Sequence, residues 1–206
     1  MGTRLLLVRH GQTDWNVEAR FQGQTDTPLN AQGRAQVCAL AERLASEKLD
    51  AIYASDLARA WETATAIAVR HGIAVQPDPR LREMLIGEWE GLTYDEIQAR
   101  DPKRLAGWFE DPMRVSPPGG EALETLVARV QSVLDDLRRL EEQHNVLLVS
   151  HGGTLRVLLC LALGMPPQNR WRLRLDEASI SELYLYDEGA ILTRFNDHHH
   201  LEGASP

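Results

Sequence analysis

Near its start the chain reads RLLLVRHG at residues 4–11, an apolar run that ends in a histidine and a glycine. Four consecutive apolar residues between polar ones are typical of a strand that is buried on both faces. Strands of that kind belong to parallel sheets that carry helices on both sides. We therefore expect residues 4–9 to form a buried strand with His10 at its carboxyl end.

The same pattern returns at residues 146–153, which read VLLVSHGG. A second buried strand is thus expected to end just before His151. In doubly wound sheets the carboxyl ends of the strands line the ligand crevice. Either histidine alone is more simply explained by packing, but the matched pair favours a functional role. His10 and His151, although 141 positions apart, are therefore predicted to meet at one edge of the sheet.

Helical patterns separate these two strands from further short apolar runs. Asn30 is a candidate cap for a helix that reaches about Lys48, because small polar side chains cap helix amino ends. Ser55 or Asp56 is expected to cap a second helix, which ends before Gly72 because glycine adopts the left-handed stop. These helices would lie on a face of the predicted sheet.

The order of the elements predicts the fold class. Residues 121–142 have the clearest amphipathic stripe and predict a long helix. Residues 179–186 and 191–195 flank a turn at 187–189 and predict an edge hairpin. We expect an α/β fold, a three-layer α/β/α sandwich whose mainly parallel sheet has an antiparallel edge strand.

The size of the chain fits one domain. At 206 residues and 23.1 kDa, one α/β domain accounts for the chain better than two equal ones. The pattern weakens at about residues 87–120, where four prolines accompany two short helical pieces at 94–100 and 103–109. We expect residues 1–206 to form a single domain with a loop and short-helix excursion at about 87–120.

Charge and hydropathy exclude two classes of partner. With 22 Lys and Arg against 30 Asp and Glu, the net charge is −8, which argues against broad binding to nucleic acid or anionic membranes. The longest later apolar run, residues 157–163, is too short to span a membrane. We expect a cytoplasmic protein.

Cys38 and Cys160 lack metal or redox spacing and are expected to be buried thiols.

Arginines accompany the histidines. Arg9 adjoins His10, and Arg59 lies in the first turns of the helix that follows the second apolar run. A cation at a helix amino end is unfavourable unless a bound anion balances both charges. Guanidinium groups fit phosphate oxygens through paired hydrogen bonds and stay charged at any relevant pH. Two arginines and two histidines around one crevice therefore indicate a site for a phosphoryl group.

Seven motifs together resemble the histidine phosphatase superfamily, also called the phosphoglycerate mutase-like family. They span nearly the whole chain in the family's order and read LVRHGQTDWN (7–16), FQG (21–23), SDLARAWETA (55–64), LRE (81–83), GEWEG (87–91), PPGGE (117–121) and SHGG (150–153). The tail NDHHHL (196–201) is also similar to the family's closing segment. The resemblance implies the phosphoglycerate mutase-like form of the sandwich and a catalytic domain.

The resemblance also implies a role for each matching residue. His10 would be the nucleophile and form a phosphohistidine, and Glu83 would give a proton to the leaving group. The phosphoryl group would be held by Arg9, Arg59 and His151, with Asn16, Gln22 and the backbone of Gly152 as further donors. No cofactor is implied. No metal is expected either, because no Asp, Glu and His cluster has ligand spacing.

Elementary chemistry supports the roles of His10 and Glu83. An imidazole attacks phosphorus only through an unprotonated nitrogen, and flanking guanidinium groups oppose its protonation. The other nitrogen of His10 must then carry a proton and donate it to a backbone carbonyl. Glu83 must begin protonated and later act as base toward water. On residue pattern alone, Glu88 and Glu90 are rival carboxylates for this role.

Three functions from different classes fit this pattern. A metal-independent phosphomonoesterase acting on a small phosphorylated metabolite fits best, because the chain is short and its GEWEG and PPGGE motifs resemble those of phosphatase members. The alternative is a 2,3-bisphosphoglycerate-dependent phosphoglycerate mutase. Glu83 and His151 are only 68 positions apart, which leaves limited room for a lid that shields phosphohistidine, and Gln12 stands where mutases often carry Glu. An inactive phospho-ligand binding module is a second alternative.

Several features carry no assignment from the sequence. The organic part of the substrate is set by loops whose conformation a sequence does not fix. Trp15, Trp89, Trp108 and the histidines at 198–200 have no predicted role. A homodimer through an edge strand stays open.

Overall fold

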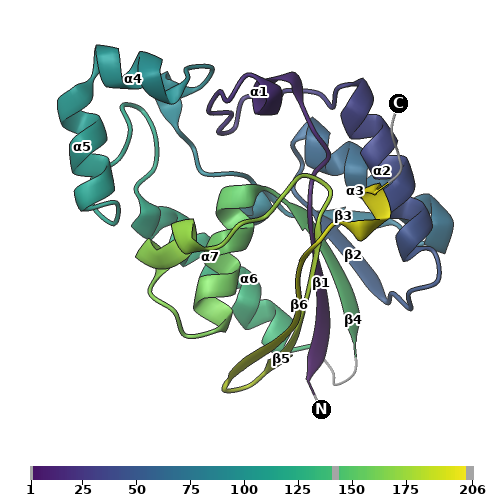
Figure 1. Cartoon of the computed structure of the whole chain (residues 1–206). Helices are drawn as coiled ribbons and strands as arrows, with labels where there is room; N and C mark the ends of the chain where they lie inside the picture. Colours follow the sequence, from purple (N-terminus) through teal and green to yellow (C-terminus); the bar gives the residue numbers. More distant parts are fainter. Residues whose placement is uncertain (1, 141–143, 203–206) are drawn as a thin grey trace.

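The computed structural model describes residues 2–140 and 144–202. They form a six-stranded sheet with helices on both faces (Figure 1). The strands are β1 (Thr3–Arg9), β2 (Ala51–Ala54), β3 (Val75–Pro77), β4 (Asn145–Ser150), β5 (Ile180–Tyr186) and β6 (Gly189–Asp197). The α-helices are α1 (Asp14–Val17), α2 (Ala31–Leu44), α3 (Ala58–His71), α4 (Tyr94–Arg100), α5 (Pro102–Glu110), α6 (Leu123–Arg138) and α7 (Gly152–Ala162). Short 3₁₀ helices are η1 (Pro79–Leu81), η2 (Gly87–Trp89), η3 (Pro167–Arg172) and η4 (His199–Leu201).

The strand order is β3-β2-β4-β1-β5-β6. Strand β4 pairs in parallel with both β1 and β2, and β3 pairs in parallel with β2. Strand β5 runs antiparallel to β1, and β5 and β6 form the hairpin at the edge of the sheet. The predicted α/β sandwich, with its mainly parallel sheet and edge hairpin, is confirmed.

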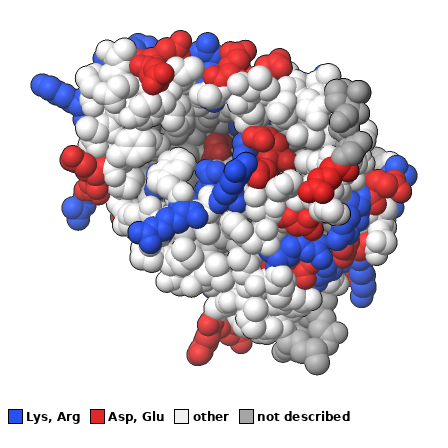
Figure 2. Space-filling model, in the orientation of Figure 1, with Lys and Arg blue, Asp and Glu red and all other residues white. Residues whose placement is uncertain are grey.

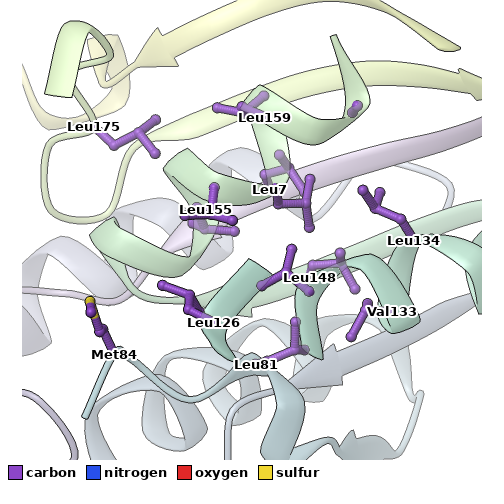
Figure 3. Packing of buried hydrophobic residues seen from close by; sticks show 14 of the residues in the cluster. Leu7, Leu81, Met84, Leu126, Val133, Leu134, Leu148, Leu155, Leu159 and Leu175 are labelled. Atoms are coloured by element: carbon purple, nitrogen blue, oxygen red, sulfur yellow. The ribbon is translucent and has the colours of Figure 1, made fainter. Parts of the chain in front are cut away.

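The apolar run of β1 is continuous because both faces of the sheet are covered. Successive side chains of a strand point to opposite faces. Leu5 and Leu7 accordingly pack in the core beneath α6 and α7, part of which is drawn in Figure 3. Leu6 and Val8 pack in a second core beneath α2 and α3. These four side chains are at most 1% exposed, so β1 is a central strand.

The caps of α2 and α3 differ in origin, because the first comes from a neighbouring residue and the second from a residue far away in the sequence. Asn30 caps α2 as predicted, and its side chain accepts a hydrogen bond from the amide of Gly33 at 2.8 Å. The prediction that Ser55 or Asp56 caps the next helix is wrong. Helix α3 follows Leu57, which offers no capping side chain, and the carboxylate of Asp26 accepts from the amide of Ala58 at 2.7 Å. Asp56 instead pairs with an arginine outside the helix.

The long amphipathic helix is shorter than predicted. Helix α6 covers Leu123–Arg138, and residues 141–143 of the predicted span lie outside the described residues.

The excursion contains α4 and α5 as predicted, and Figure 1 shows both helices standing away from the sheet. Gly72 ends α3 in the left-handed conformation with φ of 65°, also as predicted.

Two further sequence expectations have mixed outcomes. Cys160 is buried in α7, but Cys38 is exposed because its position on α2 lies on the face away from the sheet, so the prediction for Cys38 is wrong. Among the described residues, no helix is long and apolar enough to cross a membrane.

Candidate active site

The carboxyl ends of β1 and β4 bring His10 and His151 together. Their ring centroids lie 5.1 Å apart at an angle of 60°. His10 is 3% exposed and His151 is fully buried. The two strands are paired in parallel from end to end, and Arg9 lies opposite Ser150. The predicted convergence of the two histidines therefore follows directly from the register of β1 on β4.

His10 has its ring fixed by the neighbouring backbone. Its Nδ1 atom lies 2.7 Å from the carbonyl oxygen of Gly11. Because a carbonyl only accepts hydrogen bonds, Nδ1 must donate, so the proton of the neutral ring is on Nδ1 and Nε2 keeps its lone pair. Burial, together with the positive charges of Arg59 and Arg9, holds the pKa of His10 well below its ordinary value. The imidazole is thus neutral, with an available lone pair on Nε2.

His151 is held by a different contact. Its Nε2 atom lies 2.8 Å from the hydroxyl oxygen of Ser55 at the end of β2. Its Nδ1 atom is buried and has no hydrogen-bond partner among the described residues. Burial, followed by the charge of Arg59, keeps the pKa of His151 well below its ordinary value. His151 directly precedes Gly152 at the amino end of α7, where backbone amides favour an anion.

Arg59 is the second residue of α3 and is fully buried. Its Nη1 and Nη2 atoms donate to the carbonyl oxygens of Thr25 and Gly23 at 2.9 and 2.8 Å. Its Nε atom has no partner among the described residues. Burial lowers the pKa of Arg59 to about 10, and the group still remains charged at neutral pH. Its side chain has no ion-pair partner in the described part of the chain and lines the same cleft as His10.

Arg9 is anchored by the segment before β5. Its Nη1 donates to the carbonyl of Leu175 at 2.6 Å, and its Nη2 pairs with Glu177 at 2.7 Å. Its Nε atom is buried without a partner among residues 2–140 and 144–202. A Cβ placed on Gly152 would lie 3.4 Å from that Nε atom. Arg9 is therefore beside the amino end of α7, where the sequence placed the phosphoryl group.

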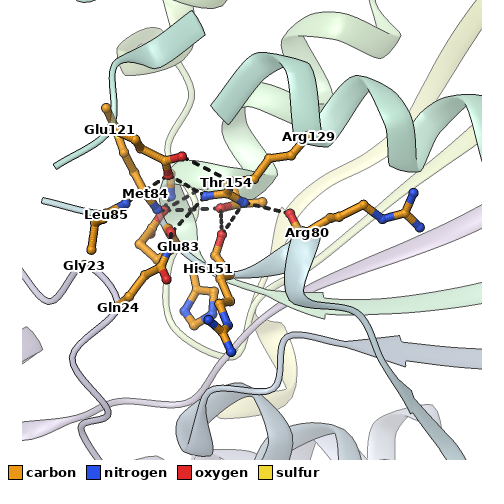
Figure 4. A network of polar contacts seen from close by, with 12 residues as sticks. Gly23, Gln24, Arg80, Glu83, Met84, Leu85, Glu121, Arg129, His151 and Thr154 are labelled. Atoms are coloured by element: carbon orange, nitrogen blue, oxygen red, sulfur yellow. Dashed lines mark hydrogen bonds and ion pairs between the residues drawn. The ribbon is translucent and has the colours of Figure 1, made fainter. Parts of the chain in front are cut away.

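Glu83 reaches the amino end of the same helix. Its carboxylate accepts from the backbone amides of Gly153 at 2.9 Å and Thr154 at 3.2 Å (Figure 4). A carboxylate at this position interacts favourably with the helix dipole. Glu83 lines the cleft together with His10. Its rival Glu90 is used structurally, accepting from the amides of Gln24 and Ile86.

Arg129 of α6 ties down the segment that carries Glu83. It donates to the carbonyl oxygens of Arg80, Arg82 and Glu83 at 2.7, 2.6 and 2.9 Å. Its Nη2 also pairs with Glu121 at 2.7 Å (Figure 4). Sequence reasoning missed Arg129, because three backbone acceptors leave no trace in side-chain identities.

Asn16 and Gln22 line the cleft as predicted. The side-chain oxygen of Asn16 accepts from the amide and hydroxyl of Thr13, and that of Gln22 accepts from the hydroxyl of Thr27. Both oxygens are thereby used inside the protein. The amide nitrogens donate to no group within the described residues and are free to donate into the cleft.

The predicted site residues all line, or directly border, one cleft. The cleft contains about 820 Å³ of space between atoms, part of which is open solvent. Figure 2 shows basic side chains gathered around this hollow. Trp108 of α5 and Trp171 of η3 also line it. Trp89 lies in the core and packs edge-on against Trp108, with ring centroids 5.8 Å apart. The excursion therefore supplies one wall of the cleft.

Three arginines of the cleft, Arg20, Arg156 and Arg170, were missed from the sequence. Arg156 of α7 and Arg170 of η3 line it on the side of Trp171. One signal pointed to Arg156, since it is the only charged residue in the otherwise apolar stretch 152–164. Among the described residues, no group of three or more His, Cys, Asp and Glu side chains is placed to hold a metal.

A family model described as the histidine phosphatase superfamily, branch 1, matches residues 5–198. The chain belongs to the histidine phosphatase superfamily. This match spans all the elements that bear the cleft residues, from β1 to the end of β6. The resemblance seen in the seven sequence motifs is thereby confirmed.

Three histidine phosphatase relatives show how closely the chain follows the family. It is 33% identical over 198 residues to phosphoserine phosphatase 1 of Hydrogenobacter thermophilus, covering 96% of this chain and 94% of that protein. It is 40% identical over 174 residues to glucosyl-3-phosphoglycerate phosphatase of Mycobacterium tuberculosis, covering 81% and 78%. The crystal structure of the α-ribazole phosphatase from Shigella flexneri matches with a TM-score of 0.88 and 31% identity, covering 95% and 96%.

Proposed function

We propose that the chain is a metal-independent phosphomonoesterase that hydrolyses a small phosphorylated metabolite through a phosphohistidine on His10. The observation that carries the proposal is the neutral His10 imidazole, whose Nδ1 donates to Gly11 and whose Nε2 is left as the nucleophile. The relatives named phosphatases support the same reaction class.

In the first step, Nε2 of His10 would form a bond to phosphorus as the ester P–O bond breaks. Glu83, protonated as the ester binds, would give its proton to the leaving oxygen, and the amides of Gly153 and Thr154 would then stabilise the carboxylate that results. Negative charge that develops on the equatorial oxygens would be stabilised by Arg59 and Arg9 and by the amide of Gly152. His151, Asn16 and Gln22 would complete this set of phosphate-binding residues.

In the second step, water would attack the phosphorus of phosphohistidine. Glu83, now ionised, would accept a proton from that water, and the P–N bond would break to release inorganic phosphate. The water that reacts can enter because the cleft is open on one side. The catalytic cycle returns Glu83 protonated and His10 neutral.

Phosphate release from p-nitrophenyl phosphate tests the proposal. The wild-type protein should hydrolyse it steadily, and His10→Ala should abolish the reaction. Hydrolysis that survives unchanged in His10→Ala would remove His10 from the mechanism. If turnover instead requires 2,3-bisphosphoglycerate and releases no phosphate, the protein is a mutase.

The expected absence of a metal is tested by chelation. Because the arginines supply the positive charge, EDTA should leave the rate unchanged. A collapse of activity that Mg²⁺ restores would contradict this mechanism.

The remaining expectations concern organisation. Residues 1–206 would act as a single catalytic domain, and the excursion at 87–120 would help to select the organic part of the substrate. A homodimer through an edge strand and a cytoplasmic location stay predictions. Sedimentation and cell fractionation test them.

A further inference from the structure

Two guanidinium groups in the cleft have no hydrogen-bond acceptor among the described residues. Arg170 is 2% exposed, and its Nη1 atom is buried without a hydrogen-bond partner among the described residues. The Nε atom of Arg156 is buried and unpartnered in the same way. Neither side chain forms an ion pair within residues 2–140 and 144–202. Buried charges are normally paired, so these two arginines need an explanation.

The other arginines of the cleft are already occupied. Arg9 pairs with a carboxylate, and Arg59 donates to two carbonyl oxygens. Arg20 pairs with two carboxylates at 2.6 and 2.9 Å. The Nε atoms of Arg9 and Arg59 are also unpartnered, but within the described residues only Arg156 and Arg170 among these arginines make no side-chain hydrogen bond or ion pair at all.

Stacking on aromatic rings explains how Arg170 is held but leaves its donors unused. Its Cζ atom lies 4.6 Å from the ring centroid of Trp171 and 5.9 Å from that of Trp108. The Cζ atom of Arg156 lies 5.6 Å from the ring of Trp171. Such contacts engage the flat face of the guanidinium and leave the edge with its N–H groups free. Burial lowers the pKa of Arg170 to about 10, so it is still a cation at neutral pH.

The two arginines lie close to the proposed phosphoryl site. Arg156 is one helical turn after Gly152 on α7, and residues four apart lie on the same face of a helix. Arg170 follows α7 on η3, which packs against that helix. Apolar side chains, among them Met84 and Ile86, line the cleft as well. Guanidinium edges pair with carboxylates and phosphates alike, but beside these apolar side chains the single charge of a carboxylate costs less to desolvate than the double charge of a second phosphate.

We propose that Arg156 and Arg170 form a carboxylate-binding subsite, so that the preferred substrates are phosphomonoesters whose organic part carries a carboxylate. This inference rests on the proposed phosphatase function. It assigns a specificity-determining role to residues from α7 and η3, and gives Trp108 of the excursion the role of positioning Arg170 through stacking.

Two matched pairs of substrates test the subsite. 3-Phosphoglycerate and glycerol 3-phosphate differ by a carboxylate in place of a hydroxymethyl group, and phosphoserine and phosphoethanolamine differ by one carboxylate. For the wild-type protein, kcat/KM should favour the carboxylate member of each pair by about 10- to 100-fold, as expected for charge-assisted hydrogen bonds. Arg156→Met and Arg170→Met should each remove most of this preference while leaving kcat/KM for glycerol 3-phosphate within about threefold.

Arg20→Met is the matched control, because it removes a cleft arginine whose partners are already in the protein. It should keep the full preference. Since Arg170 is buried, thermal unfolding checks that each variant folds, and Arg170→Lys offers a second, smaller change that keeps the charge but loses the planar fork. It should lose part of the preference.

Binding separates this inference from the proposed reaction. Calorimetry with His10→Asn, in which no phosphohistidine can form, should show tighter binding of 3-phosphoglycerate than of glycerol 3-phosphate. If no phosphomonoester is hydrolysed by the wild type yet this difference in binding persists, the reaction is wrong and the subsite stands. If p-nitrophenyl phosphate is hydrolysed but neither pair shows a preference, or Arg156→Met and Arg170→Met retain it, the subsite is wrong. A preference for a bisphosphate over both carboxylates would also overturn it.

Discussion

The Nδ1 atom of His10 lies 2.7 Å from the carbonyl oxygen of Gly11, the next residue in the chain. This hydrogen bond to the adjacent residue fixes the tautomer of the His10 ring. It also sets the direction of the Nε2 lone pair, because a planar ring with one nitrogen anchored has one orientation. The strand end that carries His10 thus holds the ring in place with an available lone pair on Nε2.

The buried histidines predict how stability depends on pH. The folded-state pKa of His10 and of His151 lies well below the ordinary value of 6.5. The unfolded chain therefore binds more protons than the folded one below that pH, and the free energy of unfolding should fall as the pH drops through 6.5. Urea unfolding between about pH 7.5 and pH 5.5, in phosphate-free buffer, measures this.

The variant His10→Asn should reduce this pH dependence, since it removes one of the groups that must stay neutral in the folded state. Equal slopes for the wild type and His10→Asn over that pH range would show that His10 takes up a proton as readily in the folded protein as in the unfolded chain.

The unpaired charge of Arg59 in the cleft predicts that inorganic phosphate stabilises the folded protein. An anion that binds only the folded state at 100 times its Kd adds about 2.7 kcal/mol, which for a chain of this size raises Tm by roughly 5–10 °C. Arg59→Met should lose most of this rise and about 10²- to 10³-fold in kcat/KM for p-nitrophenyl phosphate. Differential scanning calorimetry with and without phosphate is the measurement.

Arg70→Met on the same helix is the control for Arg59. Its side chain is 54% exposed and pairs with Glu42 at 3.0 Å, so the phosphate-dependent rise should be unchanged. A full rise in Arg59→Met would place the phosphate elsewhere.

The contacts of Arg129 predict that replacing it lowers the stability of the fold. It joins α6 to the backbone of Arg82 and Glu83 and pairs with Glu121. The pair with Glu121 is partly buried, with side chains 17% and 11% exposed, so losing it together with the backbone hydrogen bonds in Arg129→Met should cost about 2 kcal/mol in the free energy of unfolding. Urea titration measures it. At Arg139→Met on the exposed side, where the side chain is 75% exposed, the change should stay within about 0.5 kcal/mol. If both variants lowered the free energy of unfolding by similar amounts, Arg129 would have no special role in stability.

Local patterns predicted most of the fold and the centre of the site. The apolar runs that form β1 and β4 are short-range signals, and parallel pairing of these strands places His10 beside His151 without further information. The Asn30 cap was predictable for the same reason, because a helix cap depends on its own neighbours.

Contacts between segments far apart in the sequence could not be predicted. Asp26 caps α3 across 32 positions, and Arg129 donates to carbonyl oxygens 46 to 49 positions away. Such contacts depend on how loops fold, and a backbone carbonyl is the same for every residue type. The unpaired state of Arg170 was invisible for a related reason, since only the packed structure shows which donors have no acceptor.

Trapping the covalent intermediate tests the central claim most directly. Rapid quenching during turnover, without acid, followed by mass spectrometry of the peptides, should find a phosphoryl group on His10. Hydrolysis of a chiral phosphorothioate monoester, labelled with ¹⁶O and ¹⁷O, in ¹⁸O water should proceed with retention at phosphorus. The absence of the adduct together with inversion at phosphorus would show direct attack by water and contradict the account.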